Sequence, residues 1–570
     1  MSQIIGIDVG GSNTNAVLIR DGRIVTTAKY PTDHQNLLVS AQAVLEQLVR
    51  LLPQSPDNLE LHLSTTLTTN AIVEGRGEPA AALLIPGPGV NPKELKFPFP
   101  TYSVSGSTDH RGRETAPLDL AELRKTLRSI EQNGARTLAV VGKFAVRNPR
   151  QELKAAELIE QEFPEFNPVV LGHRLSGRLN FPRRVTTALL NASVSRLQTE
   201  FAKMIQELAK GYGINGPIWL LKADGGTMRL QESYRRPIET VLSGPAASVM
   251  GALALGTPEN RTTVTLDIGG TTTEIAVLVK GEPLSERDGA TIGGYRTLVP
   301  ALFSRSFGLG GDSRVYWEAG QLQIGPERLG PPIGLGGPAL TPTDALIALG
   351  KVTFGDRERV WMELKRFGQA AGLRPEQLAE QIIATFCSKT AAAIQTVFDE
   401  LNRRPVYTVS AVLTPAELKP EKLIGMGGPA SYFIPKLGTE LDLDYEVLPY
   451  AEAANAVGAA ATHPTVAVNL HADTEIGKLV IPELDELVDL SKNRLFDLKQ
   501  GRELARRRLA VYASQAGIDT EAAQLEITEE EVFNVVRGFY TAGKIFSLQA
   551  QIKPGVNRIN PGNPQQKGGC

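Results

Sequence analysis

The chain has 570 residues, of which 42% are hydrophobic and 21% charged, a composition typical of a globular protein with about two to four domains. Its 60 basic and 62 acidic residues give a net charge of −2, which excludes a bulk electrostatic attraction to nucleic acid or an anionic membrane. Two cysteines, and six histidines without metal-binding spacing, exclude a disulfide framework and a Cys- or His-based metal centre. With no leader-like segment and no run of about 18 apolar residues, we expect a cytoplasmic protein that does not bind membranes.

The N-terminal elements predict an α/β fold. Ile4–Val9 and Ala16–Ile19 are apolar, strand-like runs on either side of a glycine turn, and a third strand follows Asp21-Gly22. Residues 35–52 then repeat apolar side chains at helical spacing. Three strands followed by a helix are typical of an α/β domain.

The first glycine turn recurs later in the chain, in register and without a gap. The first copy reads Asp8-Val-Gly10-Gly11-Ser12-Asn13-Thr14, and the second reads Asp267-Ile-Gly269-Gly270-Thr271-Thr272-Thr273. Paired glycines let main-chain N–H groups approach phosphate oxygens, and the hydroxyl groups add donors. One copy alone could be an ordinary turn in a chain with 55 glycines. Two copies favour a pair of hairpins that clamp a polyphosphate, with Asp8 and Asp267 as the candidate Mg²⁺ ligands.

Two further segments carry candidate substrate contacts. Leu61–Gly77 predicts a strand, a polar turn and a helix, and Thr65, Thr66 and Asn70 lie where the strand ends. Hydroxyl groups there either cap the helix or contact a ligand. A polar insert at 103–114 contains Asp109, Arg111 and Arg113, which could bind phosphate or a substrate carboxylate, or could be solvated surface residues.

The middle of the chain alternates long helices with glycine-rich loops. Helices are predicted at 118–133, 149–163, 183–210 and 375–401, and a buried strand at 217–222. The small residues of 241–251 and 453–461 predict helices that approach either a ligand or another helix closely. The glycine- and proline-rich span 306–343 predicts a functional loop system that contains Asp312, Ser313 and Arg314.

The C-terminal region differs in character from the rest. From about residue 466 onward the charge is dense and mixed, with helical spacing that ends at Gly517. The last fifteen or so residues are rich in Pro, Asn, Gly and Lys and are predicted to be disordered. No chemistry can be attached to this region from its sequence.

Taken together, these motifs resemble the actin, sugar-kinase and Hsp70 ATPase superfamily and, within it, the hydantoinase A and 5-oxoprolinase family. The matching stretches keep the family's order over about residues 4–460. They are Asp8-Val-Gly-Gly-Ser-Asn-Thr, Ser64-Thr65-Thr66, Thr69-Asn70-Ala71, Asp109-His110-Arg111-Gly112-Arg113, Leu242-Ser243-Gly244-Pro245-Ala246, Asp267-Ile-Gly-Gly-Thr-Thr-Thr, Gly310-Gly311-Asp312-Ser313, Gly325-Pro326-Glu327, Thr343-Asp344-Ala345 and Gly427-Gly428-Pro429.

This resemblance implies two RNase H-like domains around a central cleft for ATP and Mg²⁺. We expect the first domain at 1–180, the second at 181–465 with inserted loops and helices, and an α-rich extension at 466–570. Asp8 and Asp267 would hold the metal, with Gly10–Thr14 and Gly269–Thr273 on the phosphates. Gly427, Gly428 and Pro429 would shape the adenosine pocket. Asp312 and Arg314 join the two aspartates as candidate catalytic residues, and Ser313 is a candidate substrate contact.

The activity implied by the resemblance is ATP-dependent opening of a cyclic amide such as a hydantoin or 5-oxoproline. The amide oxygen attacks the γ-phosphate, and the phosphorylated intermediate is hydrolysed, often with a separate B-type subunit. Phosphorylation makes the oxygen of an unstrained lactam a good leaving group, and the protein mainly positions groups and neutralises charge. A homo-oligomer is left open.

The sequence also departs from the family's pattern. After Gly325-Pro326-Glu327 it continues Arg-Leu-Gly-Pro-Pro-Ile-Gly, and a charge-rich stretch of roughly a hundred residues replaces the large β-rich C-terminal region of longer members. A carboxylase-type ATPase, a small-molecule kinase and a regulatory ATPase therefore stay as alternatives. Activators of radical dehydratases share the nucleotide fold but need cysteines for an iron–sulfur cluster, and this chain has only two.

Overall fold

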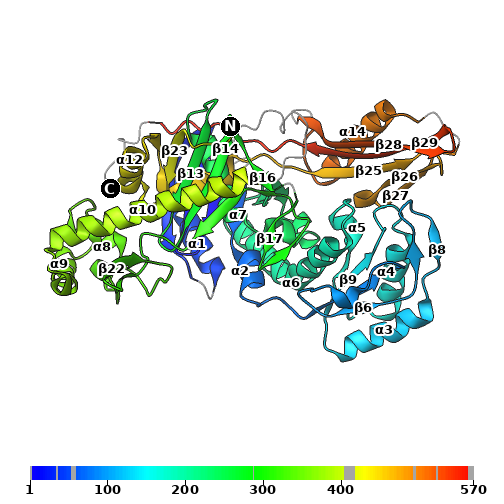
Figure 1. Ribbon diagram of the computed structural model, residues 1–570, viewed down its shortest axis with the longest axis horizontal. Helices are drawn as coiled ribbons and strands as arrows, with labels where there is room; N and C mark the ends of the chain where they lie inside the picture. The colour runs from blue at the N-terminus through cyan, green and yellow to red at the C-terminus, as the bar shows by residue number, and fades with distance from the viewer. Residues whose placement is uncertain are drawn as a thin grey trace.

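The computed structural model describes residues 3–33, 36–52, 59–286, 288–403, 417–491, 496–520 and 524–562. Two mixed sheets form its centre, while an inserted α/β unit and a C-terminal sheet lie together at one end (Figure 1). Within the described residues, no helix combines the length and the apolar composition that crossing a bilayer requires.

The first central sheet has the strand order β12-β11-β4-β1-β2-β3. The first three strands pair antiparallel, and β1, β4 and β11 pair parallel, which is the RNase H-like arrangement. Helices α1 and α6 cover one face through a continuous apolar cluster. The elements are β1 (Gln3–Val9), β2 (Asn13–Arg20), β3 (Arg23–Pro31), α1 (Leu37–Val49), β4 (Leu59–Thr65), α2 (Leu67–Val73), α6 (Phe181–Gly211), β11 (Ile218–Leu221), β12 (Thr227–Arg229) and α7 (Ser243–Leu255).

The second central sheet repeats this arrangement, with β14, β13, β23 and β24 in the places of β2, β1, β4 and β11. Strand β20 pairs with β14 as the third antiparallel strand. The elements are β13 (Thr262–Ile268), β14 (Thr273–Val279), β15 (Glu282–Pro283), β20 (Ser304–Phe307), α8 (Pro342–Ala348), α9 (Arg357–Gly368), α10 (Pro375–Asn402), β23 (Lys422–Met426), α12 (Ala430–Leu441), β24 (Asp444–Val447) and α13 (Ala454–Ala461). The prediction of two RNase H-like units is confirmed.

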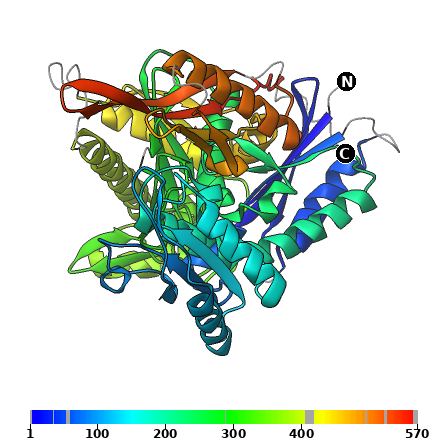
Figure 2. The same cartoon turned by 90° about the vertical axis from the view of Figure 1, so that its right-hand side faces the viewer.

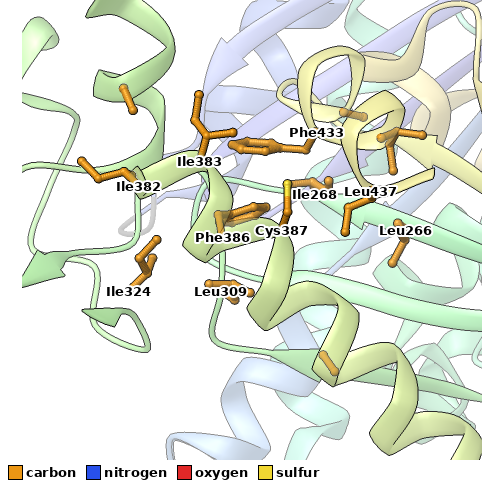
Figure 3. Packing of buried hydrophobic residues seen from close by; sticks show 14 of the residues in the cluster. Leu266, Ile268, Leu309, Ile324, Ile382, Ile383, Phe386, Cys387, Phe433 and Leu437 are labelled. Carbon is orange, nitrogen blue, oxygen red and sulfur yellow. The ribbon is translucent and has the colours of Figure 1, made fainter. Parts of the chain in front are cut away.

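Helix α10 holds the second unit together through its apolar seam. Figure 3 shows Phe386 and Cys387 of α10 facing Phe433 and Leu437 of α12, next to Ile268 of β13. The rings of Phe386 and Phe433 lie 4.1 Å apart between centroids. Burial raises the pKa of the Cys387 thiol to about 12, so this cysteine is a packing residue and not a nucleophile.

Helices α7 and α13 lock the two units together. A Cβ built on Gly251 of α7 would lie 2.2 Å from Ala454 O, and one on Gly458 of α13 would lie 2.1 Å from Ala247 O. Helix α7 follows the strands of the first sheet and α13 follows those of the second. The close contact between these two helices therefore joins the two units. The small residues therefore serve helix packing, which was one of the two interpretations of their sequence.

The inserted α/β unit interrupts the first sheet between α2 and α6. Its four strands pair parallel in the order β10-β9-β5-β6, and a two-stranded ribbon, β7-β8, extends from it. The elements are β5 (Ala80–Ile85), β6 (Thr101–Ser103), β7 (Ser107–Thr108), β8 (Glu114–Ala116), α3 (Leu120–Gln132), β9 (Thr137–Gly142), α4 (Arg150–Glu162), β10 (Val169–Leu171) and α5 (Gly172–Leu175). The first sheet thus takes strands from both sides of residue 180, where we expected its domain to end.

The C-terminal region is a five-stranded antiparallel sheet, in the order β27-β26-β25-β29-β28, covered by one helix. Figure 2 shows the long β28–β29 hairpin, in red, at the upper left of the molecule. The elements are β25 (Ala467–Asp473), β26 (Lys478–Ile481), β27 (Glu486–Asp489), α14 (Leu498–Gln515), β28 (Leu525–Arg537) and β29 (Tyr540–Ile552). Helix α14 agrees with the predicted helical spacing, but the expectation of an α-rich extension is wrong for the strands.

The described end of the chain packs against the turn between β2 and β3 and against α7. Asn560 N donates to Gly22 O at 2.8 Å, and Ile559 N donates to Ala254 O at 3.1 Å. Ile559 is buried beside α7 and α13, so the predicted disorder is wrong for 556–562. Residues 563–570, including Cys570, lie outside the described residues.

Buried charges attach the inserted unit to the C-terminal sheet. His173 of α5 lies between Glu152 and Asp485, at 2.5 Å (Nδ1 to Oε2) and 2.7 Å (Nε2 to Oδ1). Burial alone would lower the pKa of His173, but the two carboxylates raise it. The protonated imidazole therefore bridges a helix of the inserted unit and the segment between β26 and β27.

Candidate functional site

The two glycine turns have the same backbone geometry. Gly10 N donates to Asn13 O at 3.2 Å in the first turn, and Gly269 N donates to Thr272 O at 2.9 Å in the second. Each turn connects the first two strands of its sheet. The sequence repeat is therefore also a structural repeat, as expected.

The side chains of the two turns approach one another at the interface between the units. Arg328 Nη1 donates to Ser12 Oγ of the first turn at 2.9 Å and to Thr271 Oγ1 of the second at 3.4 Å. A Cβ on Gly270 would lie only 3.5 Å from Ser12 Oγ. One guanidinium thus bridges both hydroxyl clusters, so that a single small anion could contact both turns.

Not every predicted hydroxyl faces this position. Thr14 is fully buried, and its Oγ1 lies 3.1 Å from Thr32 Oγ1. Thr273 is also buried, and its Oγ1 donates to Leu309 O. These two threonines support the turns from within, which leaves Ser12, Thr271 and Thr272 as the partly exposed hydroxyl groups.

Asp8, at the end of β1, is buried in an environment that disfavours its charge. It is 3% exposed, and its Oδ1 has no hydrogen-bond partner among the residues that the structure describes. Burial raises the pKa of Asp8 to about 7; the polar side chains of Ser64 and Asn455 oppose this rise, and the charge of Asp267 adds to it.

Asp267, at the end of β13, is held by the two interlocked helices. Its Oδ2 accepts hydrogen bonds from Ser248 Oγ of α7 at 2.6 Å and from Asn455 Nδ2 of α13 at 2.9 Å. Glu274 pairs opposite Asp267 on β14, and burial raises the pKa of Glu274 to about 7. Helix packing and site geometry are therefore coupled through one carboxylate.

These two aspartates fit a bound divalent cation. The described residues contain no cluster of three or more His, Cys, Asp or Glu side chains that could enclose a metal by themselves. Mg²⁺ does not need such a cluster, because it keeps several waters and binds one or two carboxylates together with phosphate. A cation beside Asp8 would contact the carboxylate oxygen that has no partner and would stabilise its ionised form.

The loop that contains Gly310–Asp312 packs against the second glycine turn. Gly311 N donates to Gly269 O at 2.9 Å, and Asp312 N donates to Gly270 O at 2.7 Å. A Cβ on Gly310 would lie 2.4 Å from Gly270 O, so only glycine permits this contact between two backbones. The glycine-rich span is therefore part of the site, and the β21–β22 hairpin (Val315–Glu318, Gln321–Ile324) extends from it.

Asp312 turns its carboxylate toward both glycine turns. Oδ2 accepts a hydrogen bond from Arg328 Nη2 at 3.1 Å, and Oδ1 accepts one from Thr343 Oγ1 at 3.1 Å. Burial raises the pKa of Asp312, and the positive charge of Arg328 opposes the rise. Of the three loop residues selected from the sequence, Asp312 is the one that lies beside the turns.

Ser313 and Arg314 point elsewhere. Ser313 is fully buried, and its Oγ accepts a hydrogen bond from Gly310 N at 2.8 Å, so it shapes the loop. Arg314 is partly exposed and pairs with Glu327 at 3.0 Å. The arginine that reaches the site is Arg328, and the expectations for Ser313 and Arg314 find no support in the geometry.

Gly427-Gly428-Pro429 follows β23 beside the second turn. Gly427 has φ +90°, and a Cβ there would lie 2.2 Å from Ile268 O, so this position requires glycine. A Cβ on Gly428 would meet nothing within 4 Å, which leaves room beside it. Pro429 starts α12 and lies against Gly311. This arrangement suits a segment that borders a bound nucleotide.

Thr65, Thr66 and Asn70 join structural elements. Thr65 N donates to Ser243 Oγ at 3.2 Å, and the same Oγ donates to Thr65 O at 2.8 Å. Asn70 Nδ2 donates to Thr66 Oγ1 at 3.2 Å within α2. These contacts connect β4 and α2 to the start of α7, so polar support explains the cluster without a ligand.

The Asp109–Arg113 loop attaches the inserted unit to the C-terminal sheet. Asp109 Oδ1 accepts hydrogen bonds from the backbone N–H groups of Arg111 and Arg113, both at 2.9 Å. The side chain of Arg111 is 7% exposed and binds Asp473 through Nε at 2.7 Å and Glu475 through Nη1. Its guanidinium is thus already neutralised by the C-terminal sheet, and a substrate contact is not supported for this loop.

A cavity of about 750 Å³ lies apart from the turns, between β11, β12 and the C-terminal sheet. Its buried Lys222 lies 3.0 Å (Nζ to Oδ2) from Asp224 and 3.6 Å (Nζ to Oε2) from Glu239, which also pairs with Arg236. Asp224 directly precedes two glycines, without the intervening residue of the two turns, and its carboxylate is engaged by Lys222 and Thr465. The charge of Lys222 is therefore neutralised by the partly buried carboxylates of Asp224 and Glu239.

Four residues of the site were missed by the sequence interpretation: Ser248, Asn455, Glu274 and Arg328. Ser248 and Asn455 lie in the small-residue helices, where a polar residue among alanines is a detectable signal. Glu274 follows the second hydroxyl cluster directly. Arg328 had no local signal, because it reaches the turns only through the folding of the whole loop system.

The comparisons with known proteins agree with this geometry. The profile of the family described as Hydantoinase/oxoprolinase matches residues 184–468, and that of the Hydantoinase/oxoprolinase N-terminal region matches residues 4–163. Caprolactamase subunit alpha from Pseudomonas jessenii is 24% identical over 78% of this chain and 68% of its own length. The acetophenone carboxylase gamma subunit from Aromatoleum aromaticum is 27% identical over 70% of this chain, which spans 59% of that subunit.

Two solved structures share the fold over nearly the whole chain. The ATP-dependent caprolactamase from Pseudomonas jessenii has a TM-score of 0.71 at 20% identity, covering 98% of this chain and 88% of that chain. Nucleotide-free acetone carboxylase has a TM-score of 0.67 at 16% identity, covering 97% and 88%. With paired RNase H-like units, duplicated glycine turns and both family profiles in agreement, the chain belongs to the hydantoinase/oxoprolinase family.

Proposed function

We propose that this protein binds Mg-ATP between its two glycine turns and uses it to open a cyclic amide, as the whole enzyme or as its ATPase subunit. The observation that carries this proposal is the approach of the duplicated turns, whose hydroxyl groups are bridged by Arg328. Buried Asp8 and partly buried Asp267, at the ends of equivalent strands, support a metal site next to the same turns. ATP-dependent relatives with the same fold favour a nucleotide as the ligand.

Each part of the proposed site has a defined task. Main-chain N–H groups at the tips of the two turns, Gly11–Asn13 and Gly270–Thr272, would bind phosphate oxygens, and Mg²⁺ at the two aspartates would neutralise their charge. Gly427–Pro429 would border the adenosine. Phosphoryl transfer needs mainly this positioning and neutralisation, which the rigid strand ends supply.

In the proposed reaction, the lactam oxygen forms a bond to the γ-phosphorus while the bond to the bridging oxygen breaks and ADP leaves with its electron pair. Water then attacks the activated carbon and the ring C–N bond breaks, which gives an amine and an acyl phosphate. A second water molecule hydrolyses the acyl phosphate to carboxylate and phosphate. An unstrained amide needs this activation because its carbonyl carbon is a poor electrophile.

A second candidate is ATP-dependent carboxylation of a ketone. It is favoured by the acetophenone carboxylase gamma subunit, which is 27% identical over 70% of this chain, and by the fold of acetone carboxylase. Both reactions would begin with transfer of the γ-phosphoryl group to an oxygen atom. The ATP site proposed here is the same in each.

A partner subunit is part of the proposal. Relatives of this chain are named as subunits, among them caprolactamase subunit alpha and the acetone carboxylase beta subunit from Xanthobacter autotrophicus. We propose that a B-type subunit supplies the groups that hydrolyse the activated amide. The chain described here would supply the nucleotide chemistry.

The test is ADP and phosphate release with a panel of lactams, hydantoins, 5-oxoproline and ketones with bicarbonate, with and without the protein encoded beside this one. Ring-opened product formed in step with ADP supports the proposal, and carboxylated ketone supports the second candidate. Asp267→Asn should abolish turnover. Asp224→Asn, in the Asp-Gly-Gly sequence outside the turns, is the matched control and should retain it. An ATP turnover rate that is the same without any compound and with each compound of the panel would contradict both reactions.

A further inference from the structure

Arg328 occupies the position where the two glycine turns come closest. Its Nη1 donates to Ser12 Oγ at 2.9 Å and to Thr271 Oγ1 at 3.4 Å, while Nη2 donates to Asp312 Oδ2 at 3.1 Å. Three separate segments therefore converge on one guanidinium. Its buried Nε has no hydrogen-bond partner among the described residues, so the donor set of this arginine is incompletely used.

The position of Arg328 is fixed by the loop that carries it. Gly325 has φ +70°, and its N–H donates to Arg314 O at 3.0 Å, which closes the base of the β21–β22 hairpin. Arg314 N in turn donates to Glu327 O at 2.8 Å. Since the loop is attached to the second turn through Gly311 and Asp312, Arg328 is held against that turn by backbone contacts.

The contacts of Arg328 are those that an anion would take over. Ser12 and Thr271 belong to the hydroxyl clusters expected to donate to phosphate, yet here both accept from Arg328. Asp312 supplies the negative charge that the guanidinium faces. A phosphate group offers Arg328 a bidentate, doubly charged partner in place of this single carboxylate contact.

Of the phosphates in a nucleotide, the terminal one suits this position. Gly427–Pro429, the proposed adenosine border, lies beside the second unit, and Pro429 contacts the loop at Gly311. A polyphosphate that starts there and runs toward the first turn ends near Ser12. Arg328 Nη1 donates to Ser12 Oγ at 2.9 Å, so the guanidinium lies at the Ser12 end of that path.

We propose that the Arg328–Asp312 pair is a γ-phosphate sensor: the pair closes the site without nucleotide, and a triphosphate separates it by binding Arg328 directly. ADP leaves the pair intact because it does not reach Arg328. The site therefore prefers ATP over ADP, which favours product release after phosphoryl transfer. This inference rests on the proposed nucleotide site but not on the identity of the substrate.

The test compares the binding of ADP and of a non-hydrolysable ATP analogue, both with Mg²⁺, by isothermal titration calorimetry. In Arg328→Gln, affinity for the analogue should fall at least about tenfold, the loss typical of a charge-assisted hydrogen bond, while affinity for ADP changes little. Arg328→Lys keeps the charge but not the bidentate geometry and should lie between. Asp312→Asn releases Arg328 and should strengthen binding of the analogue.

Arg314→Gln is the matched control, since Arg314 lies in the same loop but pairs with the surface residue Glu327. It should change neither affinity. An equal loss of both nucleotides in Arg328→Gln, with an unchanged unfolding temperature, would overturn the sensor, as would no loss of either. If the wild-type protein binds neither nucleotide, the proposed function fails with it; if nucleotides bind but no lactam is turned over, only the proposed reaction fails.

Discussion

Replacing Asp8 by asparagine should stabilise the metal-free protein while abolishing its activity. The pKa of Asp8 is raised from 3.8 to about 7, chiefly by burial. Because this pKa is higher in the folded than in the unfolded state, folding becomes less favourable as pH rises from about 4 to about 7. A rise of about three units corresponds to at most about 4 kcal/mol at pH 8.

Asparagine keeps the shape of the side chain and removes the charge, so Asp8→Asn should recover most of that free energy at pH 8 and little at pH 4. In a chain of 570 residues that unfolds as one unit, about 4 kcal/mol corresponds to a rise in unfolding temperature of roughly 3 °C. Differential scanning fluorimetry in EDTA at both pH values measures it. Added Mg²⁺ should then stabilise the wild type but not the variant.

A variant less stable than the wild type at pH 8, or a stability difference that is the same at pH 4 and pH 8, would refute this reasoning. The first result would mean that Asp8 is a structural residue whose polar neighbours stabilise its charge. The second would mean that its ionisation is not coupled to folding. Either would remove the main support for a metal at the end of β1.

Three further predictions concern other parts of the fold. Protonated His173 joins the inserted unit to the C-terminal sheet. Because its pKa is raised in the folded state, this stabilisation is complete below pH 6.5 and is lost as pH rises through the folded-state pKa. Hydrogen exchange of β10 and β26 should accelerate in that pH range, and His173→Gln should abolish the pH dependence. Gly458→Ala, whose Cβ would lie 2.1 Å from a backbone oxygen, should lower the unfolding temperature by several degrees, whereas Gly211→Ala, which meets nothing within 4 Å, should not. Gly427→Ala should weaken ATP binding by tenfold or more, because Gly427 has a positive φ and contacts β13 closely. Gly428→Ala should fold normally. Equal unfolding temperatures and equal ATP affinities for the two variants would contradict the role of this turn.

The central architecture could be predicted because its signals are local. Each glycine turn lies between two apolar strands, and the same pattern occurs twice, so a repeated α/β unit follows from short stretches of sequence. Helices α6 and α10 have clear apolar seams over many turns. Buried, periodic elements of this kind need no knowledge of distant contacts.

The C-terminal sheet was missed for a physical reason. Strand β28 is an edge strand whose Glu529, Glu530 and Glu531 are exposed, so it shows no apolar alternation. Strand β29 does alternate, with Phe546 and Leu548 buried, but its partner strands are far away in the sequence. The helical spacing that ends at Gly517 was the one clear periodic signal in this region, so an α-rich extension was expected.

The candidate site residues also fall into two groups: those identified by a local motif, and those identified only by contacts between distant segments. Asp8 and Asp267 are identified by the motif that contains them. Arg328 and the true partners of Arg111 depend on contacts between segments more than a hundred residues apart, Ser12 in one case and Asp473 in the other. Sequence alone shows that an arginine is present in a loop, but not whether a carboxylate already neutralises it.

The most direct test of the account is a crystal structure of the protein with Mg²⁺ and a non-hydrolysable ATP analogue. The account predicts the triphosphate between Gly10–Thr14 and Gly269–Thr273, the metal at Asp8 and Asp267, and Arg328 separated from Asp312. A nucleotide bound elsewhere, such as in the cavity beside Lys222, or a triphosphate that leaves both glycine turns without contacts, would contradict it.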